Sequence, residues 1–142
     1  MHFTHPKQNH HARFGITLLP LTNTSVLVPH FHFHAISYIR VPDSFSIPVP
    51  SAWHGKALTF ELKTVNITHY SFSAAPVGEP LHVFAYTPGD IVSWGFTGTL
   101  AGVYATSNGG NGTTEAFVTN WGYKGWGQVR ENPLPANGTI VL

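Results

Sequence analysis

Hydrophobic and polar residues alternate along much of the chain, which is the pattern of β-strands with one buried face. Residues 58–65 read LTFELKTV, so leucine and phenylalanine share one face while threonine, glutamate and lysine share the other. Residues 69–75 read HYSFSAA and place Tyr70 and Phe72 together on one face. The same reasoning predicts further strands at residues 14–19, 31–41, 45–49, 81–86, 99–105 and 115–123, with the proline-bounded run 45–49 as an edge strand.

Turn-forming residues separate these runs, and few windows show the roughly 3.6-residue period of a helix. Glycine and proline occur 14 and 11 times, and turn residues cluster at 76–80, 87–90 and 107–113. Short strands at this spacing are typical of a β-sandwich or a barrel. The sequence therefore predicts an all-β, antiparallel fold, with no internal repeat and no linker that divides the chain.

Composition narrows the classes of function. Only 9% of the 142 residues are charged and 42% are hydrophobic, which favours a folded chain over a disordered one. The net charge is +1 with histidines neutral, and the 7 basic residues are scattered, which argues against a surface for nucleic acid or anionic membranes. Cysteine is absent, which excludes disulfides, thiolate metal sites and cysteine nucleophiles. No apolar run reaches the roughly 20 residues of a membrane helix.

The stretch PHFHFHAISYIRV carries three histidines, His30, His32 and His34, which alternate with Phe31 and Phe33. In a strand, the phenylalanines and the alanine after them face the core, and the histidines face the opposite side. His30 and His34 are then roughly 13 Å apart, so the whole row cannot reach one ion, although two neighbours can. The row is therefore interpreted as a polar surface that is exposed or lines a groove, with a metal site as the alternative.

Candidate catalytic groups are few. The chain has 6 acidic residues, and no pattern marks the pair of carboxylates that glycoside hydrolysis uses. The Gly-x-Ser-x-Gly motif of many serine hydrolases does not occur. The glycine-rich residues 107–112 (SNGGNG) lack the lysine and the following helix of a phosphate-binding loop, so a hairpin loop is expected there. The sequence predicts no catalytic residue, no cofactor and no bound metal.

Tryptophans are better candidates for a binding role, because flat aromatic rings stack on the C–H faces of sugars. Trp94 and Trp121 lie within apolar runs and are interpreted as core or interface residues. Trp53 and Trp126 lie near expected loops with glycine neighbours, so they are expected to be more exposed. The candidate carbohydrate-binding residues are therefore Trp53, Trp126, His30, His32 and His34.

Four N-x-[ST] sequons point to a secreted lineage. The N-terminal residues MHFTHPKQNHH, however, lack the apolar core of a secretory signal. Sequons without a signal lead us to expect that the natural chain begins before Met1. The candidate glycosylation residues are Asn23, Asn66, Asn111 and Asn137.

Three runs carry a resemblance to a known family. They are QNHHARFGITLLP at residues 8–20, THYSFSAA at residues 68–75, and DIVSWGFTGTLAGVYATSNGGNGTTEAFVTNWGYKGWGQ at residues 90–128. They resemble the C-terminal concanavalin-A-like β-sandwich of fungal glycoside hydrolase family 43 enzymes, the β-xylosidases and α-L-arabinofuranosidases. The resemblance spans nearly the whole chain, residues 3–128, and the phrase WGFTGTLAGVYATSNGG is long enough to be specific.

The resemblance implies a jelly-roll sandwich that belongs to a larger enzyme. In this family a β-propeller with the catalytic acids precedes the sandwich and packs on it, and this chain matches none of the propeller. The strands before Gln8 are expected to be missing, so the expected domains are a partial sandwich over residues 1–128 and a flexible C-terminal tail over residues 129–142. Many relatives have an aspartate in a Tyr-Phe-Asp run near the domain end, whereas residues 116–120 (AFVTN) have no acid, which argues against a cation site there.

These features lead to a first hypothesis, a non-catalytic accessory domain of a secreted, hemicellulose-degrading hydrolase. Its partners would be the catalytic propeller and plant cell-wall polysaccharide of the xylan or arabinan type, and its location would be extracellular. The alternatives are a stand-alone lectin-like carbohydrate-binding module, a self-sufficient glycosidase and a metal-binding β-protein. A sandwich that lacks strands exposes core surface and open edges, so poor solubility or self-association is also expected.

Overall fold

The computed structural model describes residues 10–37, 40–66, 68–93, 101–107 and 115–124. The chain divides into two compact units, Met1–Leu100 and Ala101–Leu142. All the regular secondary structure described here lies in the first unit. The predicted boundary between sandwich and tail, after residue 128, lies outside the described residues.

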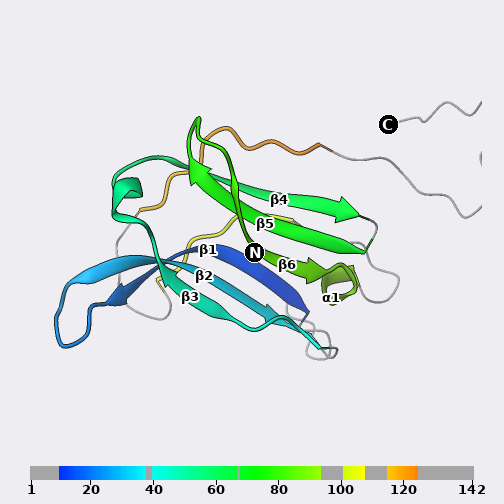
Figure 1. Cartoon of the computed structure of the whole chain (residues 1–142), viewed down its shortest axis with the longest axis horizontal. Helices are drawn as coiled ribbons and strands as arrows, with labels where there is room; N and C mark the ends of the chain where they lie inside the picture. The colour runs from blue at the N-terminus through cyan, green and yellow to red at the C-terminus, as the bar shows by residue number, and fades with distance from the viewer. Residues whose placement is uncertain (1–9, 38–39, 67, 94–100, 108–114, 125–142) are drawn as a thin grey trace, which may run out of the picture. The chain divides into compact units, whose positions relative to one another are not determined.

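The first unit consists of two antiparallel sheets of three strands each (Figure 1). Sheet A has the order β1-β2-β3 and sheet B the order β4-β5-β6. A 3-10 turn and one turn of α-helix complete the unit, and no helix in the described part of the chain is long and apolar enough to cross a membrane. The elements are β1 (His11–Pro20), β2 (Leu27–Ile36), β3 (Phe45–Pro48), η1 (Ser51–Trp53), β4 (Leu58–Asn66), β5 (His69–Pro76), β6 (His82–Pro88) and α1 (Asp90–Ser93).

The predicted all-β, antiparallel sandwich is confirmed, and most of its predicted strands form. The proline-bounded run at residues 45–49 becomes β3, which is an edge strand of sheet A as predicted. The strand predicted at residues 31–41 forms with other bounds, since β2 begins at Leu27 and ends at Ile36. The last pair in its ladder with β1 joins Ile36 to His11, the first residue of β1.

The predictions of two further strands were wrong. The described residues 101–105 and 115–123 form no strand, although their sequences are rich in β-branched and aromatic residues. A strand needs a partner for its backbone N–H and C=O groups, and none of the described ladders includes these residues. Phe117 and Tyr123, in the second unit, are 84% and 83% exposed.

The core lies between the inner faces of the two sheets. Phe31 and Phe33 of β2 are fully buried, which confirms the predicted alternation. Phe33 packs in one cluster with Phe72 and Ala85 of sheet B, and Phe31 packs in a second cluster with Ala74. Apolar side chains of both sheets thus close on each other, which is what holds a β-sandwich together.

Phe14 of β1 connects these two clusters. Its ring centroid lies 5.7 Å from that of Phe31 in the same sheet and 6.2 Å from that of Phe72 in sheet B. Phe14 is also 5.3 Å from Phe84 and 5.8 Å from Phe60. These separations are within the usual range for favourable aromatic pairs, so the core is an aromatic network and not a set of isolated contacts.

A β-bulge in β6 adds one more ring to this network. Phe72 pairs with Ala85 and Ser73 pairs with Val83, so Phe84 has no partner of its own in the ladder. The extra residue allows Phe84 and Ala85 to pack on the core side together. The ring of Phe84 lies 4.5 Å from that of Phe31. Strict alternation would have placed one of these two residues on the outer face.

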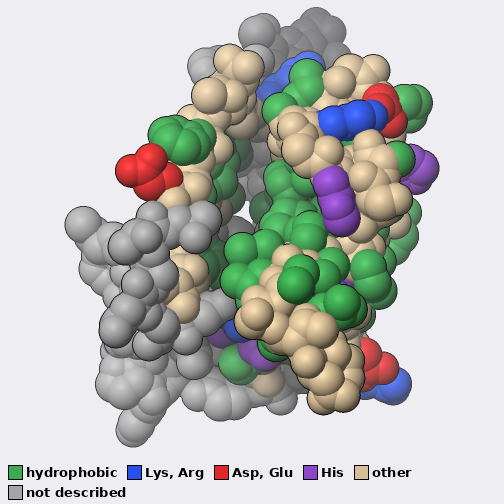
Figure 2. Space-filling model, turned by 90° about the vertical axis from the view of Figure 1, so that its left-hand side faces the viewer, with side chains coloured by type: hydrophobic (Ala, Val, Ile, Leu, Met, Phe, Trp, Pro, Cys, Tyr) green, Lys and Arg blue, Asp and Glu red, His purple; other side chains and the backbone are tan. Residues whose placement is uncertain are grey.

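Inner-face side chains of the edge strands β1 and β4 remain half-exposed. Leu18 of β1 is 47% exposed, and Phe60 and Leu62 of β4 are 44% and 47% exposed. A strand at the edge of a three-stranded sheet has a neighbour on one side only, so its core-facing side chains are incompletely covered. Hydrophobic side chains are accordingly visible at the surface of the molecule (Figure 2).

The core network predicts a large loss of stability for Phe33→Ala. The ring is fully buried and lies 5.6 Å from Phe45 and 5.5 Å from Phe72, so its removal should lower the free energy of unfolding by about 3–5 kcal/mol. Phe117→Ala removes the same ring from an exposed position and should change the free energy by less than about 0.5 kcal/mol. Urea denaturation of both variants measures the difference, and equal losses would contradict the described core.

Candidate functional site

The three predicted histidines lie together on the outer face of sheet A. His30, His32 and His34 alternate with buried residues of β2 and are themselves partly buried. The antiparallel ladders place polar or small residues of β1 and β3 beside them. We use the name histidine face for His30, His32, His34, Arg13, Gly15, Thr17 and Ser46.

The imidazole rings of this face lie close to one another. The rings of His32 and His34 are nearly parallel, with centroids 6.3 Å apart and an angle of 13° between their planes. His11, at the start of β1, lies with its ring centroid 5.6 Å from that of His34. His30 donates a hydrogen bond from Nδ1 to the carbonyl oxygen of Val28 at 3.0 Å, so its Nε2 is an acceptor when the ring is neutral.

The surroundings of His32 favour the neutral form of its ring. Burial lowers the pKa of its imidazole from the ordinary value of 6.5, because the charged ring would lose hydration. The positive charge of Arg13 and the neighbouring His34 lower this pKa further. At neutral pH the ring of His32 therefore has one N–H donor and one acceptor nitrogen.

Open space adjoins His32 on the β1 side. Gly15 is its partner in the ladder, and a Cβ atom added at Gly15 would meet no atom within 4 Å. On the β3 side the partner of His32 is Ser46, which has a short polar side chain. The His32 ring is therefore flanked by small residues, and a flat molecule can approach it from the outer side of the sheet.

The described residues contain no group of three or more His, Asp or Glu side chains that could hold a metal ion. His32 and His34 are neighbours on one strand, and no carboxylate lies opposite them, because their partners are Gly15 and Ser46 for the first and Arg13 for the second. A positively charged guanidinium beside two imidazoles disfavours a cation. The described geometry therefore gives the metal alternative no support.

Trp53 does not join the histidine face. It belongs to η1, is half-buried, and packs against Phe31 with ring centroids 5.7 Å apart and nearly perpendicular planes. Its ring also lies 5.7 Å from that of His82. Phe31 points to the core, so Trp53 covers the end of the core on the opposite side of sheet A from the histidines. Sugar contact by Trp53 stays a prediction.

The other tryptophans are placed only in part. Trp126 and Trp94 lie outside the described residues, so the structure does not test their predicted roles. Trp121 lies in the second unit and is 59% exposed, so it is not a core residue of the described chain, and its interface role stays a prediction.

Two of the four candidate asparagines, Asn23 and Asn66, are described by the structure, and both are exposed. Asn23 has a left-handed backbone, with φ of 62°, in the loop between β1 and β2. Asn66 ends β4, and its Oδ1 accepts hydrogen bonds from the backbone N–H of Thr68 at 2.8 Å and from its hydroxyl at 2.7 Å. Asn111 and Asn137 lie outside the described residues. Glycosylation at these positions stays a prediction.

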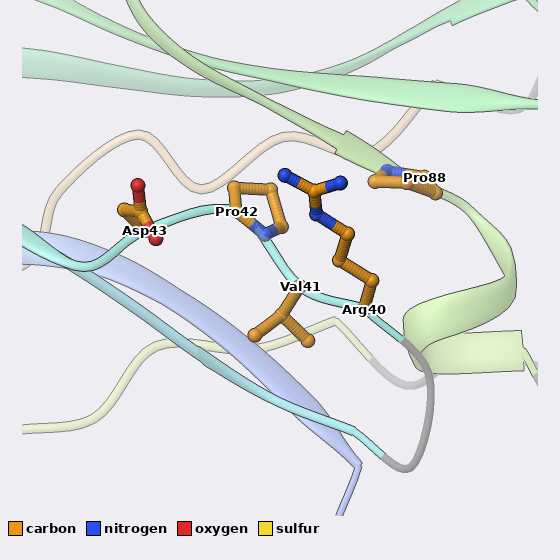
Figure 3. A pocket seen from close by; sticks show the side chains of 5 residues that line it. All are labelled: Arg40, Val41, Pro42, Asp43 and Pro88. Carbon is orange, nitrogen blue, oxygen red and sulfur yellow. The ribbon is translucent and has the colours of Figure 1, made fainter.

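Two cavities lie away from the histidine face, and the sequence did not mark either of them. The first, of about 310 Å³, lies between β6 and the segment before β3, and Figure 3 shows Arg40 extending toward Pro88. The second, of about 390 Å³, lies at the junction of β4, β5 and α1. The first is lined by Arg40, Val41, Pro42, Asp43 and Pro88, and the second by Thr64, Asn66, Thr68, His69, Tyr70, Pro88, Gly89 and Asp90.

The described lining of each cavity has a single carboxylate, Asp43 in the first and Asp90 in the second. Glycoside hydrolysis uses two carboxylates on opposite sides of the scissile bond. Glu61 lies within β4, and Glu79 lies in the β5–β6 turn, where it pairs with Lys56 at 3.1 Å. The acids of the first unit are thus on different elements, and among the residues whose positions are described neither cavity has the pair that hydrolysis requires.

The lowered pKa of His32 predicts that acidification destabilises the fold. The unfolded imidazole has its ordinary pKa near 6.5 and the folded one a lower value, so the unfolded chain binds more protons as the pH falls below 6.5. The contribution of His32 to stability is complete above that pH and is lost as the pH falls toward the folded pKa. His32→Gln should therefore lose less stability than the wild type between about pH 7 and about pH 5.

Urea denaturation at several pH values measures this effect. Thr17→Val changes the same face without removing a titratable group, so it should keep the pH dependence of the wild type. If His32→Gln also keeps that dependence, the proton uptake does not belong to His32.

Comparisons with protein-family models, with curated proteins and with solved structures give no match to this chain. The family resemblance therefore stays a prediction, and so do the partners, the substrate and the location that it implies. The geometry itself establishes an all-β sandwich with a row of histidines on its outer face.

Proposed function

We propose that this chain is a non-catalytic, accessory β-sandwich of a secreted, hemicellulose-degrading glycoside hydrolase, and that it contacts carbohydrate through the histidine face. The observation that carries the proposal is the row of three imidazoles on the outer face of a sheet whose inner face forms the core. The buried phenylalanines of β2 fix this strand against the core, so the three histidines are held on the outer face. The jelly-roll topology and the propeller partner are part of the proposal and follow from the family resemblance.

The chemistry of the histidine face suits a sugar. Each hydroxyl of a sugar is both donor and acceptor, and a neutral imidazole offers one group of each kind. The lowered pKa of His32 keeps its ring in this neutral form at neutral pH. Arg13, opposite His34, adds a guanidinium with donors only. The nearly parallel rings of His32 and His34 offer flat surfaces, and the open space above Gly15 gives a sugar ring access to them.

A binding role is favoured over catalysis by the positions of the acids. A self-sufficient glycosidase needs two carboxylates about 5–10 Å apart around the substrate. Each described cavity offers one, and the histidine face has none. The chain's own residues thus bind and orient in this proposal, and the bond-breaking groups belong to the propeller domain.

Isothermal titration of the purified chain with arabinoxylan, xylan and arabinan tests the proposal. We expect saturable binding, and we expect the variant with both His32→Ala and His34→Ala to raise the Kd roughly tenfold, because two hydrogen bonds of about 0.5–1.5 kcal/mol each are lost. His69→Ala removes an imidazole from sheet B and should leave the Kd unchanged.

The outcome also separates the two non-catalytic hypotheses. Binding by this chain alone would favour the stand-alone, lectin-like module over a purely supporting domain. A folded chain that binds none of the three polysaccharides would contradict the carbohydrate contact. Equal binding by the double variant and the wild type would move the contact away from the histidine face.

A further inference from the structure

We infer that the open edge of β4 is a dimerisation surface, and that its occupant is β4 of a second copy of this chain. The two strands pair antiparallel about a two-fold axis that stands normal to the sheet, midway between Leu62 of one copy and Leu62 of the other. Such an axis is called an axis through Leu62. Sheet B then continues from one copy into the other as a single sheet of double width. This surface is distinct from the histidine face, which belongs to sheet A.

The strand β4 is the edge that is best suited to pairing among the four edges of the two described sheets. Edge strands are commonly protected by proline or by short length, because exposed backbone N–H and C=O groups invite another chain to pair. β3 has 4 residues including Pro48, β6 is interrupted by a bulge and ends in Pro88, and β1 lies against α1 and ends in Pro20. β4 has 9 residues without proline, and in the described chain it is laddered to β5 alone.

The charges of β4 are complementary to those of its own copy. Under a two-fold axis through Leu62, each residue lies opposite the one that is equally far from the axis in the second copy. Glu61 of each copy then lies opposite Lys63 of the other copy, which gives two equivalent pairs. Both residues are exposed and lie on the side of sheet B that faces away from the core, beside Ser73 and Ser71 of β5, which are buried. Opposite residues have Cβ atoms about 4.5–5.5 Å apart, which suits a cross-strand ion pair.

The same charges disfavour the neighbouring registers. An axis through Glu61 places two glutamates opposite each other, and an axis through Lys63 places two lysines opposite each other. Like charges in such positions are destabilising. An axis through Phe60 or Thr64 leaves both charged residues opposite uncharged ones. Among these alternatives, the axis through Leu62 alone pairs every charge on the strand with its opposite.

Apolar surface on the inner side of β4 provides the driving force. Phe60 and Leu62 face the core but are 44% and 47% exposed, and in the part of the chain that the structure describes no strand pairs with β4 on that side. The proposed pairing sets Leu62 against Leu62 of the second copy and Phe60 beside Thr64. Burial of this surface favours association, while the ion pairs on the outer side select the register.

A disulfide tests the register directly. The chain has no cysteine, so Leu62→Cys introduces a single thiol per copy, and the two thiols meet at the axis. Directly opposite strand residues have separations that a disulfide can span. Under mild oxidation we expect this variant to form a covalent dimer. Val65→Cys is the matched control, because three residues from the axis the two thiols are about 20 Å apart and should stay free.

Charge exchange tests the ion pairs. Glu61→Lys or Lys63→Glu alone turns both opposite-charge pairs into like-charge pairs, so we expect the Kd of the dimer to rise roughly tenfold or more. The double variant with both changes, or an equal mixture of the two single variants, restores the complementary pairs and should restore the dimer. Glu79→Lys changes the charge equally in the β5–β6 turn and should not alter the Kd.

Sedimentation equilibrium of the wild type and of each variant, checked for folding by circular dichroism, gives the result. A wild-type chain that stays monomeric at all concentrations overturns the proposal. A dimer whose Kd is unaffected by the charge changes, or which crosslinks through Val65→Cys as readily as through Leu62→Cys, uses another surface or register and also overturns it. Rescue by the double variant separates a broken interface from a misfolded chain.

Discussion

The packing of aromatic rings between the two sheets is the constraint on which the rest of the structure depends. Phe31 of β2 contacts Phe14 of its own sheet and Phe60 and Phe84 of the other, so the inner face of β2 is fixed against sheet B. A slip of one residue in this strand would turn every side chain to the opposite face. Burial of the phenylalanines therefore also determines that the histidines point outward, and a surface feature is set by the core.

The fold could be predicted from the sequence where the alternation of side chains coincides with a real partner strand. β4 and β5 are the clearest examples, since both their extents and their faces follow from the pattern. Residues 115–123 show the limit, because an apolar, β-branched run does not reveal whether another strand is present to pair with it. The bulge at Phe84 was also beyond prediction, since two adjacent inward residues break the alternation that marks a strand in the sequence.

The candidate site was predictable along a strand but not across strands. The shared face of His30, His32 and His34 follows from their spacing alone. The presence of Arg13 and Gly15 beside them depends on the register between β1 and β2, which no pattern in the sequence specifies. Trp53 shows the same difficulty, because its loop position suggested exposure, while the fold brings it against Phe31. The two cavities combine residues from separate elements, so no local motif marked them.

The bulge in β6 has a consequence for the size of any assembly. A bulge twists its strand and interrupts the regular spacing of backbone groups, and β6 also ends in Pro88, so this edge is a poor template for another strand. Sheet B thus has one edge that is suited to pairing and one that is not. Pairing of identical β4 edges would leave only the two β6 edges at the ends of the joined sheet. Strand addition on this sheet is therefore expected to end at a closed pair of copies and not to grow into a fibril.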